Sequence, residues 1–378
     1  MYSTLGHLAM MQDARRMGAY SRAIAETVRR GDVVLDVGCG AGALTFLALE
    51  AGASHVFAVE SSESIELAKL VARKNRIANI TFLKADLRDV ALPGPVDVIV
   101  ADVRGATPVL GNSLQVMQVA RAKHLREGGR MIPVSDRIFV APIESPEAHG
   151  SVSGWHMSFG KADYSCLSDV ASNQTRFVRF SGSAVLAIPV ALTPDIDYRA
   201  DCPRTAGIDT VFEALRDGHC HGLAAWFEAT LSERVSMSTS PEEPHTIYGQ
   251  AYFPGREPQE VKTGDRLQAS LRVTFVGQEP VWTWSIRGPG DSPKSETHSS
   301  LRGRVLSGDA LRARAPEYVP SLNIEGDIDY EIIGLMKERR SNAEIGQLLL
   351  KSFPSHFNTA DEAISRVGKL AVRYAVVG

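Results

Sequence analysis

The sequence contains few cysteines, and none of them lies in a CxxC pair. The 4 cysteines among its 378 residues are scattered at positions 39, 166, 202 and 220. This spacing predicts reduced thiols in a cytoplasmic protein. His219 and His221 flank Cys220, but adjacent residues seldom chelate one ion, so we expect no metal site.

Long apolar runs and an excess of one charge are also lacking. No window approaches the roughly 18 uncharged apolar residues of a membrane-spanning helix, so we expect no membrane span. The first 18 residues contain Asp13, Arg15 and Arg16 and no apolar core, which is not typical of a secretory signal. The net charge of −3 is small, so we do not expect nucleic acid as a partner.

What is present is the balance of a globular protein of two or three domains, with 44% apolar and 22% charged residues. The first part alternates apolar strands with amphipathic helices, which favours βαβ units and a parallel sheet. We therefore predict a doubly wound, Rossmann-like α/β domain over residues 1–134. The strands are expected at 33–35, 55–59, 80–84 and 96–101, and the helices at 8–30, 43–51 and 62–75.

The pattern changes after about residue 135. Short alternating stretches punctuated by Gly and Pro predict an antiparallel β-barrel-like domain over 135–285. Residues 286–324 are rich in Gly, Pro, Ser and Arg and are interpreted as a linker or mobile loop. Two capping boxes, beginning at Ser341 and Thr359, open amphipathic runs and predict a three-helix C-terminal domain over 325–378.

The strongest functional signal is the segment VLDVGCGAG at residues 34–42. A strand that turns sharply into a helix needs glycine where the backbone approaches a ligand, here Gly38, Gly40 and Gly42. The same glycines also fit a dinucleotide turn. Asp36 argues against a dinucleotide, because its carboxylate would repel a pyrophosphate and suits a ligand with an ammonium group.

Two further acids stand where strands end. Glu60 ends the second strand, where it is expected to accept hydrogen bonds from both ribose hydroxyls of a nucleoside. Asp86 follows the third strand, where it is expected to meet an adenine amino group. Each has a structural alternative, because Glu60 also suits a helix N-terminus and Asp86 also suits an N-cap.

At these residues the sequence resembles the class I S-adenosylmethionine-dependent methyltransferases, and specifically the protein arginine methyltransferases. The segment HLAMMQDARRMGAY at 7–20 is similar to the helix that closes over the cofactor in that family, and Arg16 would pair with the methionine carboxylate. The resemblance implies S-adenosylmethionine as cofactor, with Ser61 and Leu87 beside Glu60 and Asp86. It also implies a homodimer formed through an arm near 155–180.

The acceptor loop departs from the family. The family grips the substrate guanidinium with two glutamates, and the matching stretch here has Asp102 and Gly111 at those places, with Arg104 between them. The family's Thr-His-Trp motif becomes Thr-Ile-Tyr, ending at Tyr248. By this match Asp102 is the candidate to stabilise or deprotonate an amine acceptor and also borders the cofactor. Tyr248 is a candidate pocket wall, and Arg104 would orient a carboxylate acceptor.

These residues leave three hypotheses open. The first is an enzyme that methylates N or O of a peptide or specialised-metabolite acceptor. The second is an arginine (guanidino) N-methyltransferase with a remodelled acceptor loop. The third is a non-catalytic S-adenosylmethionine-binding scaffold. The C-terminal helices weakly resemble the helical part of PqqD-like peptide-chaperone modules. We interpret them first as a packing appendage or dimer element, and a peptide-chaperone module or a winged-helix nucleic-acid binder is the alternative.

Overall fold

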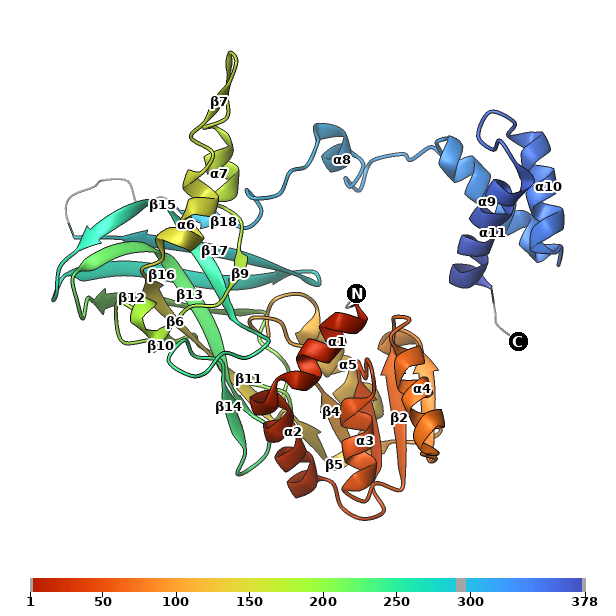
Figure 1. The fold of residues 1–378 in the computed structure, drawn as a ribbon, viewed down its shortest axis with the longest axis horizontal. Coiled ribbons are helices and arrows are strands. Elements are labelled where there is room, and N and C mark those ends of the chain that lie inside the picture. Colours follow the sequence, from red (N-terminus) through yellow and green to blue (C-terminus); the bar gives the residue numbers. More distant parts are fainter. Residues whose placement is uncertain (1–2, 290–296, 376–378) are drawn as a thin grey trace. The chain divides into compact units, whose positions relative to one another are not determined.

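The computed structural model describes residues 3–289 and 297–375. The chain divides into two compact units, Met1–Val305 and Leu306–Gly378. The larger unit combines a parallel α/β domain with an antiparallel β domain, and the smaller is helical (Figure 1). No helix in the described part of the chain is long and apolar enough to span a membrane.

The N-terminal domain is built on a five-stranded parallel sheet in the order β3-β2-β1-β4-β5. Its strands are mostly buried apolar runs, as expected for a parallel sheet covered by helices. The order reverses between β1 and β4, so the expected doubly wound fold is confirmed. The elements are β1 Val33–Val37, β2 His55–Glu60, β3 Ile80–Lys84, β4 Val96–Ala101, β5 Leu125–Ile132, α1 Thr4–Gln12, α2 Ala14–Thr27, α3 Ala43–Glu50, α4 Ile65–Asn75, α5 Ser113–His124 and the 3₁₀ turn η1 Leu87–Asp89.

The helix expected over 8–30 is two helices, α1 and α2, separated at Asp13. Asp13 Oδ1 accepts a hydrogen bond from Arg16 N at 3.0 Å and so caps α2. Asp13 Oδ2 accepts from Ile247 N at 2.7 Å, which ties the break to the β domain. An aspartate that caps a helix competes with a continuous helix, and this tertiary contact selects the break.

The β domain contains two antiparallel sheets. One has the order β10-β6-β13-β15-β9, with β11 also paired to β6 and β14 to β13; the other has the order β12-β16-β17-β18. The strands are β6 Ser135–Ile143, β9 Arg176–Val178, β10 Val190–Ala191, β11 Ile196–Asp197, β12 Thr205–Glu213, β13 Gly218–Thr230, β14 Ser236–Ser238, β15 Gln250–Val261, β16 Arg266–Val276, β17 Glu279–Arg287 and β18 His298–Ser299.

Large aromatic side chains join the two sheets. Trp282 and Trp284 of β17 are buried and pack against Phe253 of β15. Trp284 Nε1 donates to Pro254 O at 2.9 Å, which satisfies the buried indole nitrogen. The expected domain limit at 285 lies inside β17, and β18 continues the same sheet beyond it.

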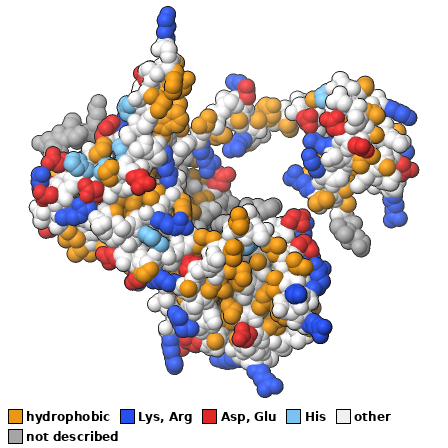
Figure 2. Space-filling model, in the orientation of Figure 1, with side chains coloured by type: hydrophobic (Ala, Val, Ile, Leu, Met, Phe, Trp, Pro, Cys, Tyr) orange, Lys and Arg blue, Asp and Glu red, His pale blue; other side chains and the backbone are white. Residues whose placement is uncertain are grey.

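An arm projects from the β domain within the stretch expected to mediate dimerisation. It comprises α6 Pro146–Ser153, the hairpin β7 Ser158–Phe159 and β8 Ala162–Asp163, and α7 Leu167–Ala171. Hydrophobic side chains gather along it (Figure 2). Trp155, Met157, Phe159 and Tyr164 are all exposed there. Such a strip on a projecting element is typical of a protein–protein contact.

The C-terminal unit has its own core. It comprises α8 Gly308–Arg312, α9 Ile324–Lys337, α10 Asn342–Ser352 and α11 Ala360–Tyr374. Ile332, Ile345, Leu349 and Val367 are buried at its centre. The capping box predicted at Ser341 is confirmed. At Thr359 only half of the box forms, because the Glu362 carboxylate accepts from Asn358 N instead.

Candidate active site

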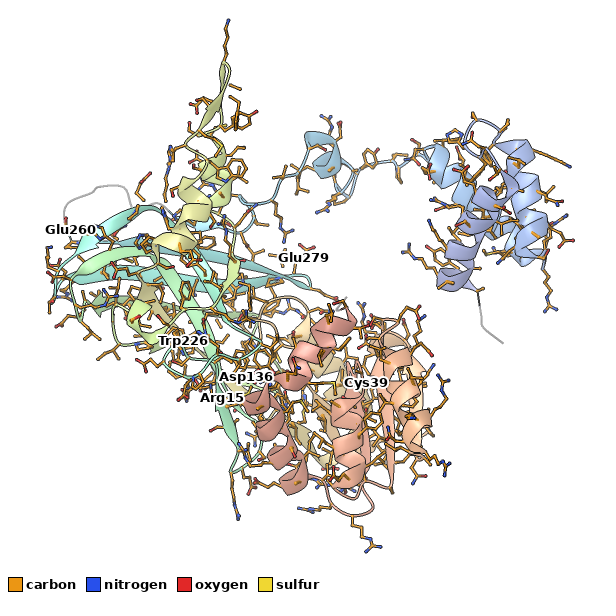
Figure 3. All side chains as sticks on the ribbon, viewed as in Figure 1. Arg15, Cys39, Asp136, Trp226, Glu260 and Glu279 are labelled. Carbon is orange, nitrogen blue, oxygen red and sulfur yellow. The ribbon has the colours of Figure 1, made fainter. Side chains whose placement is uncertain are left out.

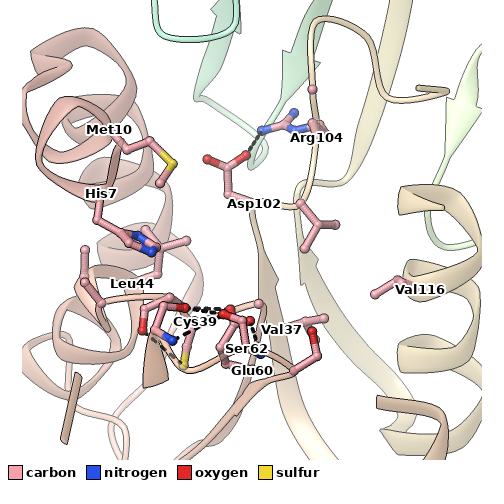
Figure 4. Close-up of a pocket in the computed structure, with 18 of the residues that line it drawn as sticks. His7, Met10, Val37, Cys39, Leu44, Glu60, Ser62, Asp102, Arg104 and Val116 are labelled. Carbon is pink, nitrogen blue, oxygen red and sulfur yellow. Dashed lines mark hydrogen bonds and ion pairs between the residues drawn. The ribbon is translucent and has the colours of Figure 1, made fainter. Parts of the chain in front are cut away.

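A cavity of about 730 Å³ opens at the carboxyl ends of β1, β2 and β4. This is the point where the strand order reverses, and open α/β sheets bind ligands there. His7 and Met10 of α1 border the cavity on one side, and Asp102 and Arg104 stand away from the glycine turn (Figure 4). Ile247 and Tyr248 complete the wall from the β domain.

The turn between β1 and α3 exposes bare backbone to the cavity. Gly38 and Gly40 have φ of 72° and 51°, a conformation that favours glycine. A Cβ at Gly38 would stand 2.8 Å from Val103 Cγ1, and one at Gly40 would stand 2.8 Å from His7 Cε1. A side chain at either position would collide with these two residues, so both positions require glycine. Gly42 lies outside the cavity lining, and a Cβ there would meet Ala68 Cβ at 2.9 Å, so Gly42 serves the packing of α3.

Asp36 lies beneath this turn and is not part of the cavity lining. Its Oδ2 accepts a hydrogen bond from Thr45 Oγ1 at 2.5 Å, and the residue is 1% exposed. Burial raises the pKa of the Asp36 carboxyl to about 7, although the Thr45 hydrogen bond opposes this. The structure thus places Asp36 as a support of the turn rather than as the direct partner of a ligand ammonium group.

Glu60 reaches the cavity from the end of β2. Its Oε2 accepts from Gly40 N at 3.2 Å, and its Oε1 accepts from Ser62 N at 2.8 Å. These bonds fix the carboxylate against the glycine turn and leave each oxygen a lone pair for a ligand hydroxyl. Ser61 lies beside it in the lining. The arrangement suits the ribose contact expected from the sequence.

Asp86 lines the cavity but is also tied to its own turn. It accepts from Arg88 N at 2.9 Å as the cap of η1, and the Arg88 guanidinium binds both its oxygens. The Arg88 hydrogen bonds lower the pKa of Asp86 to about 2. Asp86 therefore both caps η1 and lines the cavity. The buried Leu87 follows it in the lining and offers an apolar surface.

Asp102 stands at the end of β4 and joins three parts of the larger unit. Its Oδ2 accepts from Arg16 Nε of α2 at 2.5 Å and from the Tyr248 hydroxyl at 2.6 Å. Tyr248 belongs to the loop before β15. Burial alone would raise the pKa of Asp102, but the charges of Arg16 and Arg104 outweigh it and lower the pKa. Asp102 is therefore ionised at neutral pH and is a weak base.

Arg104 is engaged by the protein itself. Its Nη1 donates to Asp136 Oδ1 at 2.8 Å, and its Nη2 donates to the Tyr20 hydroxyl at 2.5 Å. Its guanidinium also lies 5.0 Å from the centre of the Phe227 ring. Its side chain is 2% exposed. The sequence predicted that Arg104 orients an acceptor carboxylate. In the structure its short hydrogen bonds go to Asp136 and Tyr20 instead.

Several site residues were not singled out from the sequence. His7 and Met10 fall within the segment that resembled the closing helix, so that resemblance carried a signal for them. Asp136 carried none, because it lies at the start of β6 within an ordinary strand pattern. Figure 3 marks it where the β domain meets the N-terminal domain. In residues 3–289 and 297–375, no cluster of three or more His, Cys, Asp or Glu side chains is arranged to hold a metal ion.

The raised pKa of Asp36 makes a pH-dependent prediction. An unfolded chain ionises this carboxyl near pH 4, whereas the folded protein does so at about 7. Between these values the unfolded state has lost a proton that the folded state keeps, so the free energy of unfolding falls as pH rises. We expect the free energy of unfolding of Asp36→Asn, relative to that of the wild type, to rise by on the order of 3 kcal/mol between pH 4 and pH 7. Urea unfolding at both ends of the range tests this, and an equal difference at both would contradict it.

Comparisons with known proteins match both parts of the larger unit. A methyltransferase domain model matches residues 29–141, and a model of the arginine methyltransferase oligomerization subdomain matches residues 135–278. Both end before the C-terminal unit, so the expected likeness of that unit to peptide-chaperone modules stays a prediction.

The fold is shared with solved arginine methyltransferase structures. The Trypanosoma brucei PRMT1 enzyme–prozyme complex with AdoHcy has a TM-score of 0.67 at 21% identity, covering 78% of this chain and 96% of that one. Arabidopsis thaliana protein arginine methyltransferase 10 has a TM-score of 0.67 at 21% identity, covering 79% and 97%.

Proteins that are similar in sequence are also named as protein arginine N-methyltransferases. A protein arginine N-methyltransferase 1 of Dictyostelium discoideum is 28% identical over 288 residues, 71% of this chain and 82% of the relative. A probable protein arginine N-methyltransferase 1.2 of Arabidopsis thaliana is 30% identical over 293 residues, 74% of this chain and 79% of the relative. With its cavity, its glycine turn and both subdomains in place, the chain belongs to the protein arginine N-methyltransferase family.

Proposed function

We propose that the protein transfers the methyl group of S-adenosylmethionine to a guanidino nitrogen of an arginine acceptor. The observation that carries this proposal is Asp102, an ionised carboxylate at the acceptor end of a cavity in a member of the arginine methyltransferase family. A guanidinium pairs well with a carboxylate through charge-assisted hydrogen bonds.

The residues around the cavity fit the cofactor. Gly38 and Gly40 line the cavity with backbone that has no side chain, and Glu60 lines the same cavity. Arg16 borders the cavity near Asp102 and would hold a carboxylate of the ligand. When bound, S-adenosylmethionine supplies a methyl group on a positively charged sulfur that leaves as a neutral thioether.

The protein's own contribution is positioning and charge. Arg16 and Tyr248 fix Asp102 from two directions, so the carboxylate has one orientation before the acceptor arrives. This orientation would direct the acceptor nitrogen toward the methyl carbon, and such preorganisation lowers the barrier of an in-line displacement. Because its pKa is lowered, Asp102 would act by stabilising positive charge on the acceptor rather than by removing a proton at the outset. The methylated nitrogen would then lose one proton, and this proton would pass to solvent.

A second candidate has a specific observation in its favour. Gly111 stands where the family has its second glutamate, and it is not part of the cavity lining. The carboxylates that line the cavity within the described residues are Glu60, Asp86 and Asp102, and the first two lie near the expected nucleoside. A site with one acceptor carboxylate also suits a neutral N or O acceptor on a peptide or specialised metabolite.

The proposal is tested by identifying the methylated atom. Purified protein is incubated with S-adenosylmethionine and matched peptides that differ in one residue, Arg, Lys, Ser or Glu, and products are assigned by mass spectrometry. Methylation of the arginine peptide on a guanidino nitrogen is the expected result. Methylation of another peptide instead would favour the second candidate. Tight cofactor binding without turnover of any acceptor would favour the non-catalytic scaffold.

Replacing Asp102 separates catalysis from cofactor binding. Asp102→Asn keeps the shape and the Tyr248 hydrogen bond but removes the negative charge. We expect kcat to fall by about a hundredfold or more, as when a preorganised charge-stabilising group is lost. Affinity for S-adenosylhomocysteine, measured by calorimetry, should stay nearly unchanged. Asp195→Asn, at an exposed ion pair with Arg137, is the matched control. Normal turnover by Asp102→Asn would reject a role for this carboxylate.

We also propose that the protein is a homodimer that associates through its arm. Phe159 at the hairpin is 67% exposed, and the match to the family's oligomerization subdomain includes the arm. Phe159→Ser removes apolar area from a contact that must exclude water, so the dimer should dissociate at lower dilution than the wild type. Sedimentation velocity measures this. Leu311→Ser, an exposed position on α8, is the control. An unchanged mass for Phe159→Ser across the dilution series would contradict the arm contact.

A further inference from the structure

A buried polar network behind Asp102 is not explained by the proposed reaction. Arg104 donates to Asp136 Oδ1, and Asp136 Oδ2 accepts from the Tyr198 hydroxyl at 2.5 Å. The side chains of Arg104 and Asp136 are 2% and 0% exposed. Arg104 Nε is buried without a hydrogen-bond partner among the described residues. A fully buried pair with an unsatisfied nitrogen is weak evidence for a stabilising role, because desolvation offsets much of its attraction.

The place of Arg104 relative to Asp102 suggests another role. The Oδ2 of Asp102 is occupied by Arg16 and Tyr248. Its Oδ1 faces Arg104 Nη2 at 3.5 Å, a long contact that leaves the oxygen capacity for a further donor. An acceptor group that binds this oxygen therefore meets the positive charge of Arg104 directly beside it. Asp136 binds Nη1, the other terminal nitrogen of Arg104, so within this pair it is the cation that faces Oδ1 of Asp102.

Apart from Asp102 and Asp136, the side chains in contact with this guanidinium are neutral, so they do not offset the attraction between its charge and Oδ1. The Tyr20 hydroxyl accepts from Arg104 Nη2 and itself donates to Ala101 O at 3.0 Å. The rings of Phe227 and Tyr248 lie 5.0 and 5.8 Å from the guanidinium carbon. These contacts hold the side chain in one position. Arg104 is thus a fixed internal guanidinium beside the carboxylate expected to hold an acceptor guanidinium.

We propose that Arg104 is a specificity-determining residue that shares Oδ1 of Asp102 with the acceptor and weakens the site for guanidinium groups. Arginine recognition then depends on contacts made by the rest of the acceptor, and a short guanidino compound binds poorly. The proposal rests on the proposed function in naming a guanidino acceptor, but it concerns a binding preference that is measured without turnover.

The test compares a cationic probe with a neutral probe of the same shape. Ethylguanidinium and N-ethylurea are titrated by calorimetry into protein saturated with S-adenosylhomocysteine. The variant Arg104→Met, Asp136→Ala, Tyr198→Phe removes all three members of the network together, which avoids an unpaired buried charge. We expect it to bind ethylguanidinium at least tenfold more tightly than the wild type, with N-ethylurea binding changed by much less.

Two controls keep the outcome decisive. Arg137→Met makes the same substitution at an exposed arginine of β6 and should leave both probes unchanged. If the triple variant melts early, the double variant Arg104→Gln, Asp136→Asn takes its place, because its two amides can hydrogen bond to each other while both charges are removed. A gain in cation affinity does not arise from misfolding. Equal or weaker ethylguanidinium binding in a variant with the wild-type melting temperature overturns the proposal.

This result is separable from the test of the proposed function. If the wild type fails to methylate arginine peptides but the variant gains ethylguanidinium affinity, the proposed function falls and the role of Arg104 stands. If the wild type methylates arginine and the variant shows no gain, the role of Arg104 alone is rejected. Tighter binding of both probes to the same extent would indicate an enlarged pocket and would also reject it.

Discussion

The ionised carboxylate of Asp102 is the constraint on which the active site depends. It is buried at the end of a central strand, and a buried charge persists only with strong partners. Arg16 comes from α2 and Tyr248 from the β domain, so the partners that keep Asp102 charged also fasten the N-terminal helices and the β domain to the sheet. On the proposed function, recognition of the acceptor and assembly of the cavity would therefore share one set of interactions.

The two sides of the cavity are built differently: the cofactor side from local backbone, and the acceptor side from side chains of distant elements. Near the glycine turn the wall is backbone with left-handed glycines, and Glu60 is held by two backbone amides. These features are local to a strand and its turn. The acceptor side instead gathers Arg16 from α2, Asp102 and Arg104 from the loop after β4, and the neutral Tyr248 from the loop before β15. Its character is therefore set by tertiary packing.

The same division explains how much was predictable from sequence. Four strands of the parallel sheet, the glycine turn and the capping box at Ser341 are encoded within a few neighbouring residues, so pattern and spacing were enough to predict them. The fifth strand, β5 Leu125–Ile132, was not expected, because its polar sequence lacks a buried apolar run. The break at Asp13 was missed because it is selected by Ile247, more than 200 residues away. Asp36 was predicted as a ligand contact from its position in the motif. That position does not determine the direction of its side chain, which lies outside the cavity lining. Asp136 and Tyr198 were not predicted as part of the site, because no local sequence pattern marks a residue as a buried partner of Arg104.

The central claim is that Asp102 is held ionised by its two guanidinium neighbours and the Tyr248 hydroxyl. Carbon-13 NMR of protein labelled at the aspartate carboxyl measures this directly, with the Asp102 resonance assigned by its absence in Asp102→Asn. The account predicts that this resonance keeps the chemical shift of a carboxylate, unchanged, from about pH 8 to about pH 5, because its pKa lies below the ordinary value for aspartate. A resonance that titrates within that range would contradict it.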